Sequence, residues 1–142
     1  MTNIMVATDG SGGACRAIDM AAELAKALAC DLLIVTVADR LLEEEARQLP
    51  HSGATPGDLL EALTGQTLKA AEARARKVGP PRIEVRTCWG DVTQSLIELA
   101  AQTSSRMIIV GRRGRGQLAG LLLGSVSQKL VSLAPCAVVV VP

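Results

Sequence analysis

Short apolar runs alternate along the chain with longer stretches in which apolar residues recur every three or four positions. The short runs predict strands, and the longer stretches predict helices with one apolar face. Their alternation is typical of βαβ units, and therefore of a parallel sheet covered by helices. The five predicted strands span residues 4–7, 32–38, 83–89, 107–110 and 137–141.

Four helices are predicted between these strands, over about residues 14–28, 60–78, 92–100 and 124–133. Asp9 or Ser11 is expected to cap the first helix, because a side-chain oxygen at this position accepts a free backbone N–H. Gly79 and the two prolines after it end the second helix. The long connection over residues 39–56 contains two prolines and an acidic run. We expect it to form a partly helical, mobile flap.

The predicted strands differ in how their faces are covered. Residues 83–89 alternate between apolar and polar side chains, which predicts a half-exposed strand at an edge of the sheet. The runs at 4–7, 32–38 and 107–110 are continuously apolar, as in central strands with helices on both faces. The run at 137–141 is equally apolar although it is the last strand, so it also needs a cover.

Composition and charge narrow the class of protein. The length of 142 residues predicts one domain spanning residues 1–142, and a hydrophobic content of 49% excludes disorder as the main state. A net charge of +1 and a single aromatic residue, Trp89, argue against a nucleic-acid partner. We expect Trp89 to serve in packing. Beyond residue 110 there is no acidic residue, which favours a compact anionic ligand near four basic residues: Arg112, Arg113, Arg115 and Lys129.

The four cysteines include no C-x-x-C pair, and His51 is the one histidine that could supplement them, so a zinc site is not expected. We expect the thiols to be reduced and to lie in or near the core, and His51 to lie in a solvated loop. The N-terminal residues lack the pattern of a signal peptide, and no window approaches 18 consecutive apolar residues. We therefore expect a cytoplasmic protein without a membrane partner.

Two glycine-rich turns follow predicted strands, at residues 8–13 and 111–116. In an open α/β sheet the ligand crevice lies at the carboxyl ends of the strands, so both turns are expected to border it. The second turn has the glycine spacing of a P-loop, but Gln117 and Leu118 replace the lysine and the hydroxyl residue. It also loosely matches a dinucleotide fingerprint, yet no acidic residue follows it to bind a ribose. Neither motif is therefore supported.

A longer glycine pattern fits better. The spacing Gly111-x2-Gly114-x9-Gly124-Ser125 resembles that of the ATP-binding branch of the universal stress protein family. The segments MVATDGS, LLIVTVAD and GLLLGSVSQKLVSLAPCAVVVVP resemble its first strand, its second strand, and its last loop, helix and strand. The resemblance covers the whole chain. It implies a Rossmann-like, open five-stranded parallel sheet of order 3-2-1-4-5 with helices on both faces.

The resemblance also implies a nucleotide site. Asp9 would bond the ribose or the adenine edge, beside a base pocket formed by the residues before it and by the Val37 backbone. Glycines in the second turn would let backbone amides approach the ribose and the α-phosphate. The start of the last helix would bind phosphate through N–H and hydroxyl groups. The expected site residues are Ala7, Thr8, Asp9, Val37, Gly111, Arg112, Arg113, Gly114, Gly124, Ser125, Val126 and Ser127.

Simpler roles are open for several of these residues. Asp9 could act only as a helix cap, and Gly124-Ser125 could be an ordinary helix start. Arg112 and Arg113 could be solvated loop charges, since the family often has a small hydroxyl residue where Arg112 stands.

The expected function is that of an ATP-binding sensor or regulator in a stress response, with Mg²⁺ bound, if present, through the phosphates. No general base is evident, so at most very slow ATP hydrolysis is expected. The alternatives are a nucleotide-independent protein-interaction module of the same fold, and an ATP-using transferase, for which no acceptor site is found. Because the resemblance places residues 137–141 at a sheet edge, we also expect a homodimer through that strand.

Overall fold

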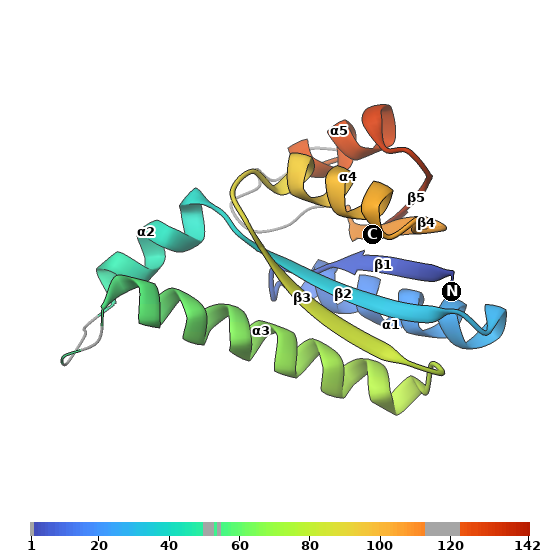
Figure 1. Ribbon diagram of the computed structural model, residues 1–142, viewed down its shortest axis with the longest axis horizontal. Coiled ribbons are helices and arrows are strands. Elements are labelled where there is room, and N and C mark those ends of the chain that lie inside the picture. Colours follow the sequence, from blue (N-terminus) through green and yellow to red (C-terminus); the bar gives the residue numbers. More distant parts are fainter. Residues whose placement is uncertain (1, 50–52, 54, 113–122) are drawn as a thin grey trace.

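The computed structural model describes residues 2–49, 53, 55–112 and 123–142. Its sheet has five strands in the order β3-β2-β1-β4-β5 (Figure 1). Every neighbouring pair is parallel. The predicted order is therefore confirmed, and the predicted strand ends agree within one residue. The strands are β1 (Asn3–Ala7), β2 (Asp31–Ala38), β3 (Ile83–Trp89), β4 (Met107–Gly111) and β5 (Ala137–Val141).

Helices cover both faces of the sheet (Figure 1). One core cluster joins the sheet to α1 and α3, and a second joins its other face to α4 and α5. The helix α2 extends beyond the end of the sheet and packs against α3 through a small satellite cluster. The helices are α1 (Gly12–Leu28), α2 (Arg40–Gln48), α3 (Pro56–Val78), α4 (Val92–Gln102) and α5 (Ser125–Leu133).

The central strands are apolar at consecutive positions because each of their faces meets a helix layer. Ile4 and Val6 belong to the cluster beneath α1 and α3, whereas Met5 between them belongs to the cluster beneath α4 and α5. All three side chains are fully buried. This alternation confirms the prediction for β1, and the same pattern holds in β2 and β4.

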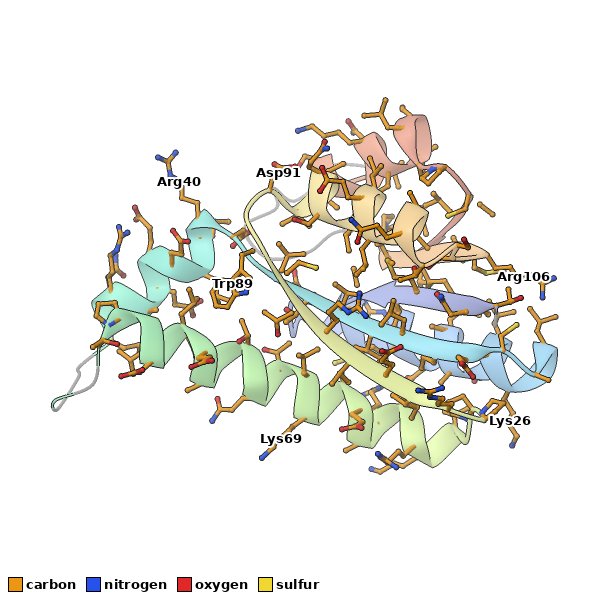
Figure 2. The ribbon with its side chains drawn as sticks, in the orientation of Figure 1. Lys26, Arg40, Lys69, Trp89, Asp91 and Arg106 are labelled. Atoms are coloured by element: carbon orange, nitrogen blue, oxygen red, sulfur yellow. The ribbon has the colours of Figure 1, made fainter. Side chains whose placement is uncertain are left out.

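The edge strand β3 is half-exposed, as its alternating sequence predicts. Trp89, at its end, is 57% exposed (Figure 2), so the prediction that this residue serves in packing is wrong. The physical reason is its place in the sheet: β3 has a strand neighbour, β2, on one side only, and Trp89 is the last residue of β3.

The ends of the helices carry the expected signals. Ser11 is the N-cap of α1, and its hydroxyl accepts the backbone N–H of Ala14 at 3.3 Å. This assigns the cap to Ser11 rather than to Asp9. Gly79 ends α3 with φ of 91°, a conformation that glycine adopts without steric cost. The predicted partly helical connection contains α2, while its mobility stays a prediction.

The cysteines occupy core or near-core positions, as expected. Cys30 is buried and the other three, Cys15, Cys88 and Cys136, are half-buried. Burial raises the pKa of the Cys88 and Cys136 thiols above the ordinary value, which disfavours the reactive thiolate. His51 lies outside the described residues. Within the described part of the chain, no helix is long and apolar enough to span a membrane.

Candidate functional site

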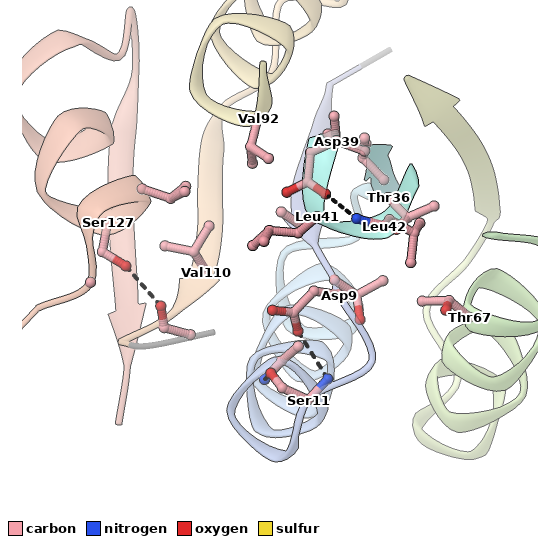
Figure 3. Close-up of a pocket in the computed structure, with 18 of the residues that line it drawn as sticks. Asp9, Ser11, Thr36, Asp39, Leu41, Leu42, Thr67, Val92, Val110 and Ser127 are labelled. Carbon is pink, nitrogen blue, oxygen red and sulfur yellow. Dashed lines mark hydrogen bonds between the residues drawn. The ribbon is translucent and has the colours of Figure 1, made fainter. Parts of the chain in front are cut away.

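A cleft lies at the carboxyl ends of β1, β2 and β4 (Figure 3). It is closed on one side by the start of α2 and on the other by the start of α5. Arg113 and Gly114 lie outside the described residues. Of the predicted site residues that the structure describes, the cleft brings together Ala7, Thr8, Asp9, Val37, Gly111, Gly124, Ser125, Val126 and Ser127.

The turn after β1 holds Asp9 at the cleft wall. One carboxylate oxygen of Asp9 accepts the backbone N–H of Ser11 at 2.9 Å. The hydroxyl of Thr8, which is 6% exposed, accepts the N–H of Gly10 at 3.2 Å. Gly10 has φ of +83°, a backbone conformation that is unfavourable for a residue with a Cβ atom, so glycine suits this tight turn. The turn thus orients a carboxylate, a hydrogen-bond acceptor, towards the ligand space.

A second carboxylate, Asp39, stands at the corresponding position after β2. It is the N-cap of α2, and one of its oxygens accepts the N–H of Leu42 at 3.0 Å. Sequence reasoning missed Asp39, although a signal was present: like Asp9, it is an acidic residue directly between a buried strand and a helix. The side chains of Leu41 and Leu42 also line this end of the cleft. Leu41 is 61% exposed there, so a bound ligand would cover apolar surface.

The opposite wall of the cleft presents hydrogen-bond donors. The first N–H groups of a helix have no intrahelical acceptor, and they are normally satisfied by a side-chain cap. At the start of α5 the N-cap is Gly124, and among the described residues no side-chain cap bond is made. The N–H groups at this end, together with the exposed hydroxyl residue Ser125, therefore favour an anion, assisted by the helix dipole.

Ser127 has a different role from the one expected. Its hydroxyl donates to the carbonyl oxygen of Gly111 at 2.8 Å and approaches that of Arg112 at 3.2 Å. The residue is 3% exposed. Because its proton is directed to the backbone, Ser127 fastens α5 to the end of β4, and in this arrangement it positions the donors rather than supplying one.

Arg112 does not line the cleft. Its backbone continues the sheet, since its N–H donates to Val141 and its carbonyl accepts the N–H of Gly124 at 2.8 Å. Its Nε atom is buried and has no hydrogen-bond partner among the described residues. The expectation that the Arg112 side chain contributes to the site is therefore not supported by this geometry.

Gly111 lacks a side chain for a structural reason. A Cβ atom at this position would lie 2.9 Å from the carbonyl carbon of Gly13 and 3.3 Å from the backbone nitrogen of Ala14. The end of β4 therefore approaches the first turn of α1 more closely than any side chain would allow. This packing requires a glycine whether or not a ligand is bound.

We expect Gly111→Ala to destabilise the fold by about 1–3 kcal/mol, because the overlapping atoms are backbone and cannot rotate away. Urea unfolding followed by circular dichroism measures this loss. The matched control is Gly65→Ala in α3, where an added Cβ meets nothing within 4 Å and a helix former is favoured. Equal stability of the two variants would contradict the close-packing account of Gly111.

Two further residues reach the cleft without a sequence signal. Thr67 comes from the middle of α3, and its hydroxyl would lie 3.8 Å from a Cβ placed on Gly10. Thr36 is 3% exposed and lies on the same face of β2 as the α3 layer. Both hydroxyl residues enter the site through packing between elements that are distant in the sequence.

The completed site has two chemically different ends. Carboxylates and apolar side chains follow β1 and β2 (Figure 3), whereas the backbone N–H groups at the start of α5 lie beside the end of β4. A ligand that fits both ends has hydrogen-bond donors and a flat apolar part at one end, and an anion at the other. The fold is that of an open, Rossmann-like α/β domain, with a cleft at the carboxyl ends of its strands.

Comparison with known proteins gives the family. The model of the universal stress protein family matches residues 1–142. A universal stress protein of Mycobacterium tuberculosis is 31% identical, over 97% of this chain and 94% of the relative. One from Thermus aquaticus is 32% identical, over 97% of this chain and 96% of the relative. The chain belongs to the universal stress protein family.

Solved structures agree with the architecture. Universal stress protein UspA from Lactobacillus plantarum has a TM-score of 0.81 at 24% identity, over 99% of this chain and 97% of that one. A universal stress protein solved in complex with cAMP has a TM-score of 0.75 at 30% identity, over 99% and 95% of the two chains. The first supports the fold, and the second concerns a relative that binds an adenine nucleotide.

Proposed function

We propose that the cleft binds an adenine nucleotide, with ATP as the expected ligand, and that the bound state regulates a stress response. The observation that carries the proposal is the uncapped start of α5 facing two oriented carboxylates across one cleft. A nucleotide has the matching parts, since its phosphate is an anion while its sugar and base carry donors. The relative that was solved with cAMP supports the same ligand class.

The orientation follows from the chemistry of the two walls. The phosphates lie at the N-terminus of α5, where helix dipole and N–H groups favour negative charge. The ribose and base lie towards Asp9 and the backbone of Val37. Mg²⁺ would be held through the phosphates, because the described residues contain no cluster of three acidic, cysteine or histidine side chains.

We propose a sensor or regulator rather than an efficient catalyst. Asp9 and Asp39 each use one carboxylate oxygen to accept a backbone N–H, which suits orientation of a ligand. We further propose that the protein acts in the cytoplasm as a homodimer. The dimer would form through β5, whose outer edge has no strand neighbour in this sheet.

The direct test is to identify what the protein carries after native purification. With one Trp and no Tyr, the chain absorbs weakly near 280 nm, so a bound nucleotide should shift the spectrum towards 260 nm. Mass spectrometry of the supernatant after denaturation should identify an adenine nucleotide. Ligand-free protein that also gives no calorimetric signal with ATP, ADP, AMP or cAMP would reject the proposal and favour an interaction module without nucleotide.

A further inference from the structure

Asp39 has the features of a residue that recognises one particular group of a ligand by hydrogen bonding. It is the first residue after β2 and lines the cleft (Figure 3). The bond from the Leu42 N–H, at 3.0 Å, fixes one carboxylate oxygen and thereby the plane of the group. None of the ion pairs formed by the described residues includes Asp39. The carboxylate therefore keeps acceptor capacity in a fixed orientation.

The order of the strands indicates which part of a nucleotide reaches Asp39. The start of α5 is tied to the end of β4 by the bond from the Gly124 N–H to the Arg112 carbonyl. In the sheet, β1 follows β4 and β2 follows β1. Since neighbouring strands are about 4.8 Å apart, the end of β2 is roughly two such spacings from the phosphate end. Phosphate, sugar and base follow each other in the same order, which places the base at β2.

The surroundings of Asp39 suit a purine. Leu41 and Val92 line the same end of the cleft and provide apolar surface for the faces of a ring. A carboxylate only accepts hydrogen bonds, so it favours a base with an amino group and disfavours one with a carbonyl oxygen at the same position. Adenine has an amino group at position 6, whereas hypoxanthine and guanine have a carbonyl there.

We propose that Asp39 selects adenine over 6-oxopurines by accepting a hydrogen bond from the 6-amino group. This inference rests on the proposed nucleotide-binding function and adds the residue that determines base specificity. Asp9 lies one strand nearer to the phosphate end, so in this arrangement it accepts a hydrogen bond from the ribose.

The test is Asp39→Asn, measured by calorimetry with ATP and with inosine triphosphate. Asparagine caps helices as well as aspartate does, so α2 should be kept. Its amide can also donate to a carbonyl oxygen. We expect the wild type to prefer ATP, and the variant to lower the ratio of the two affinities by at least about tenfold, as for loss of one buried hydrogen bond to a charged group.

The matched control is Asp91→Asn. Asp91 is likewise an N-cap aspartate, accepting the Gln94 N–H at 2.9 Å, but it stands at the start of α4 (Figure 2) and does not line this cleft. This variant should leave the ratio of affinities unchanged. A wild type that binds ATP and inosine triphosphate equally, or an Asp39→Asn variant that keeps the wild-type preference, would overturn the inference.

A comparison with 2′-deoxy-ATP separates base from sugar recognition. If Asp39→Asn changes the preference for ATP over the deoxynucleotide instead of the preference over inosine triphosphate, Asp39 contacts the ribose and the inference is wrong. If the wild type binds none of the three nucleotides, the proposed function itself fails. The two failures are therefore distinguishable.

Discussion

Ser125→Pro should weaken ATP binding by at least about tenfold, or about 1.4 kcal/mol, while leaving the fold intact. Ser125 is the first residue of α5, and proline is well tolerated there because its missing N–H has no partner within the helix. The preceding Gly124 has φ of −70° and ψ of 166°, a conformation compatible with a following proline. The substitution therefore removes an N–H and a hydroxyl from the phosphate end alone. Calorimetry measures the affinity.

The companion variant Ser125→Ala removes the hydroxyl and keeps the N–H. It should have a smaller effect than Ser125→Pro if the open helix terminus binds the phosphates. The midpoint temperature of thermal unfolding should be close to the wild-type value for both variants, because Ser125 is exposed. Unchanged ATP affinity in a folded Ser125→Pro protein would show that the phosphates bind elsewhere.

Val140→Pro should convert the proposed dimer to a monomer without unfolding the subunit. The carbonyl of Val141 accepts the Arg112 N–H, so Val141 directs its backbone groups towards β4. Because these directions alternate along a strand, Val140 directs its N–H to the open edge of the sheet. Proline there removes an outward donor and spares the ladder with β4. Sedimentation at micromolar concentration should show a loss of dimer.

The control for this experiment is Val140→Ala, which shortens the side chain but keeps the outward N–H. It should remain dimeric if backbone pairing between two β5 edges holds the subunits together. A monomeric wild type would falsify the edge-pairing account. A fully dimeric Val140→Pro protein would instead place the interface on another surface.

Prediction from sequence worked best where the signal is local or periodic. The strand boundaries agree within one residue because the apolar runs in the central strands are continuous, and each run is followed directly by a polar residue or a glycine: Thr8, Asp39 and Gly111. The glycine pattern located the start of α5 and the end of β4 correctly. The prediction that Trp89 serves in packing was wrong because strand periodicity does not say whether another element covers the end of an edge strand.

The functional residues show the same limit. Asp9 and Ser125 stand next to glycines and could be found from the motif, and Asp39 could have been found from its place between strand and helix. Thr67 could not, because its approach to Gly10 depends on how α3 crosses the sheet. The role of Ser127 was also hidden, since its acceptor, the Gly111 carbonyl, is 16 positions away in the sequence.

The sequence by itself determined the class of fold, the family resemblance and the places of Asp9, Gly111 and Gly124 at the cleft, because these depend on periodicity and spacing along the chain. Only the tertiary structure decided which donors remain open and which are used in packing. It showed that Gly111 is required by contact with α1, that Ser127 is bonded to the backbone, and that Asp39 faces the ligand space. The physical reason is that hydrogen bonds and close contacts between distant segments depend on distances in space, which one sequence does not specify.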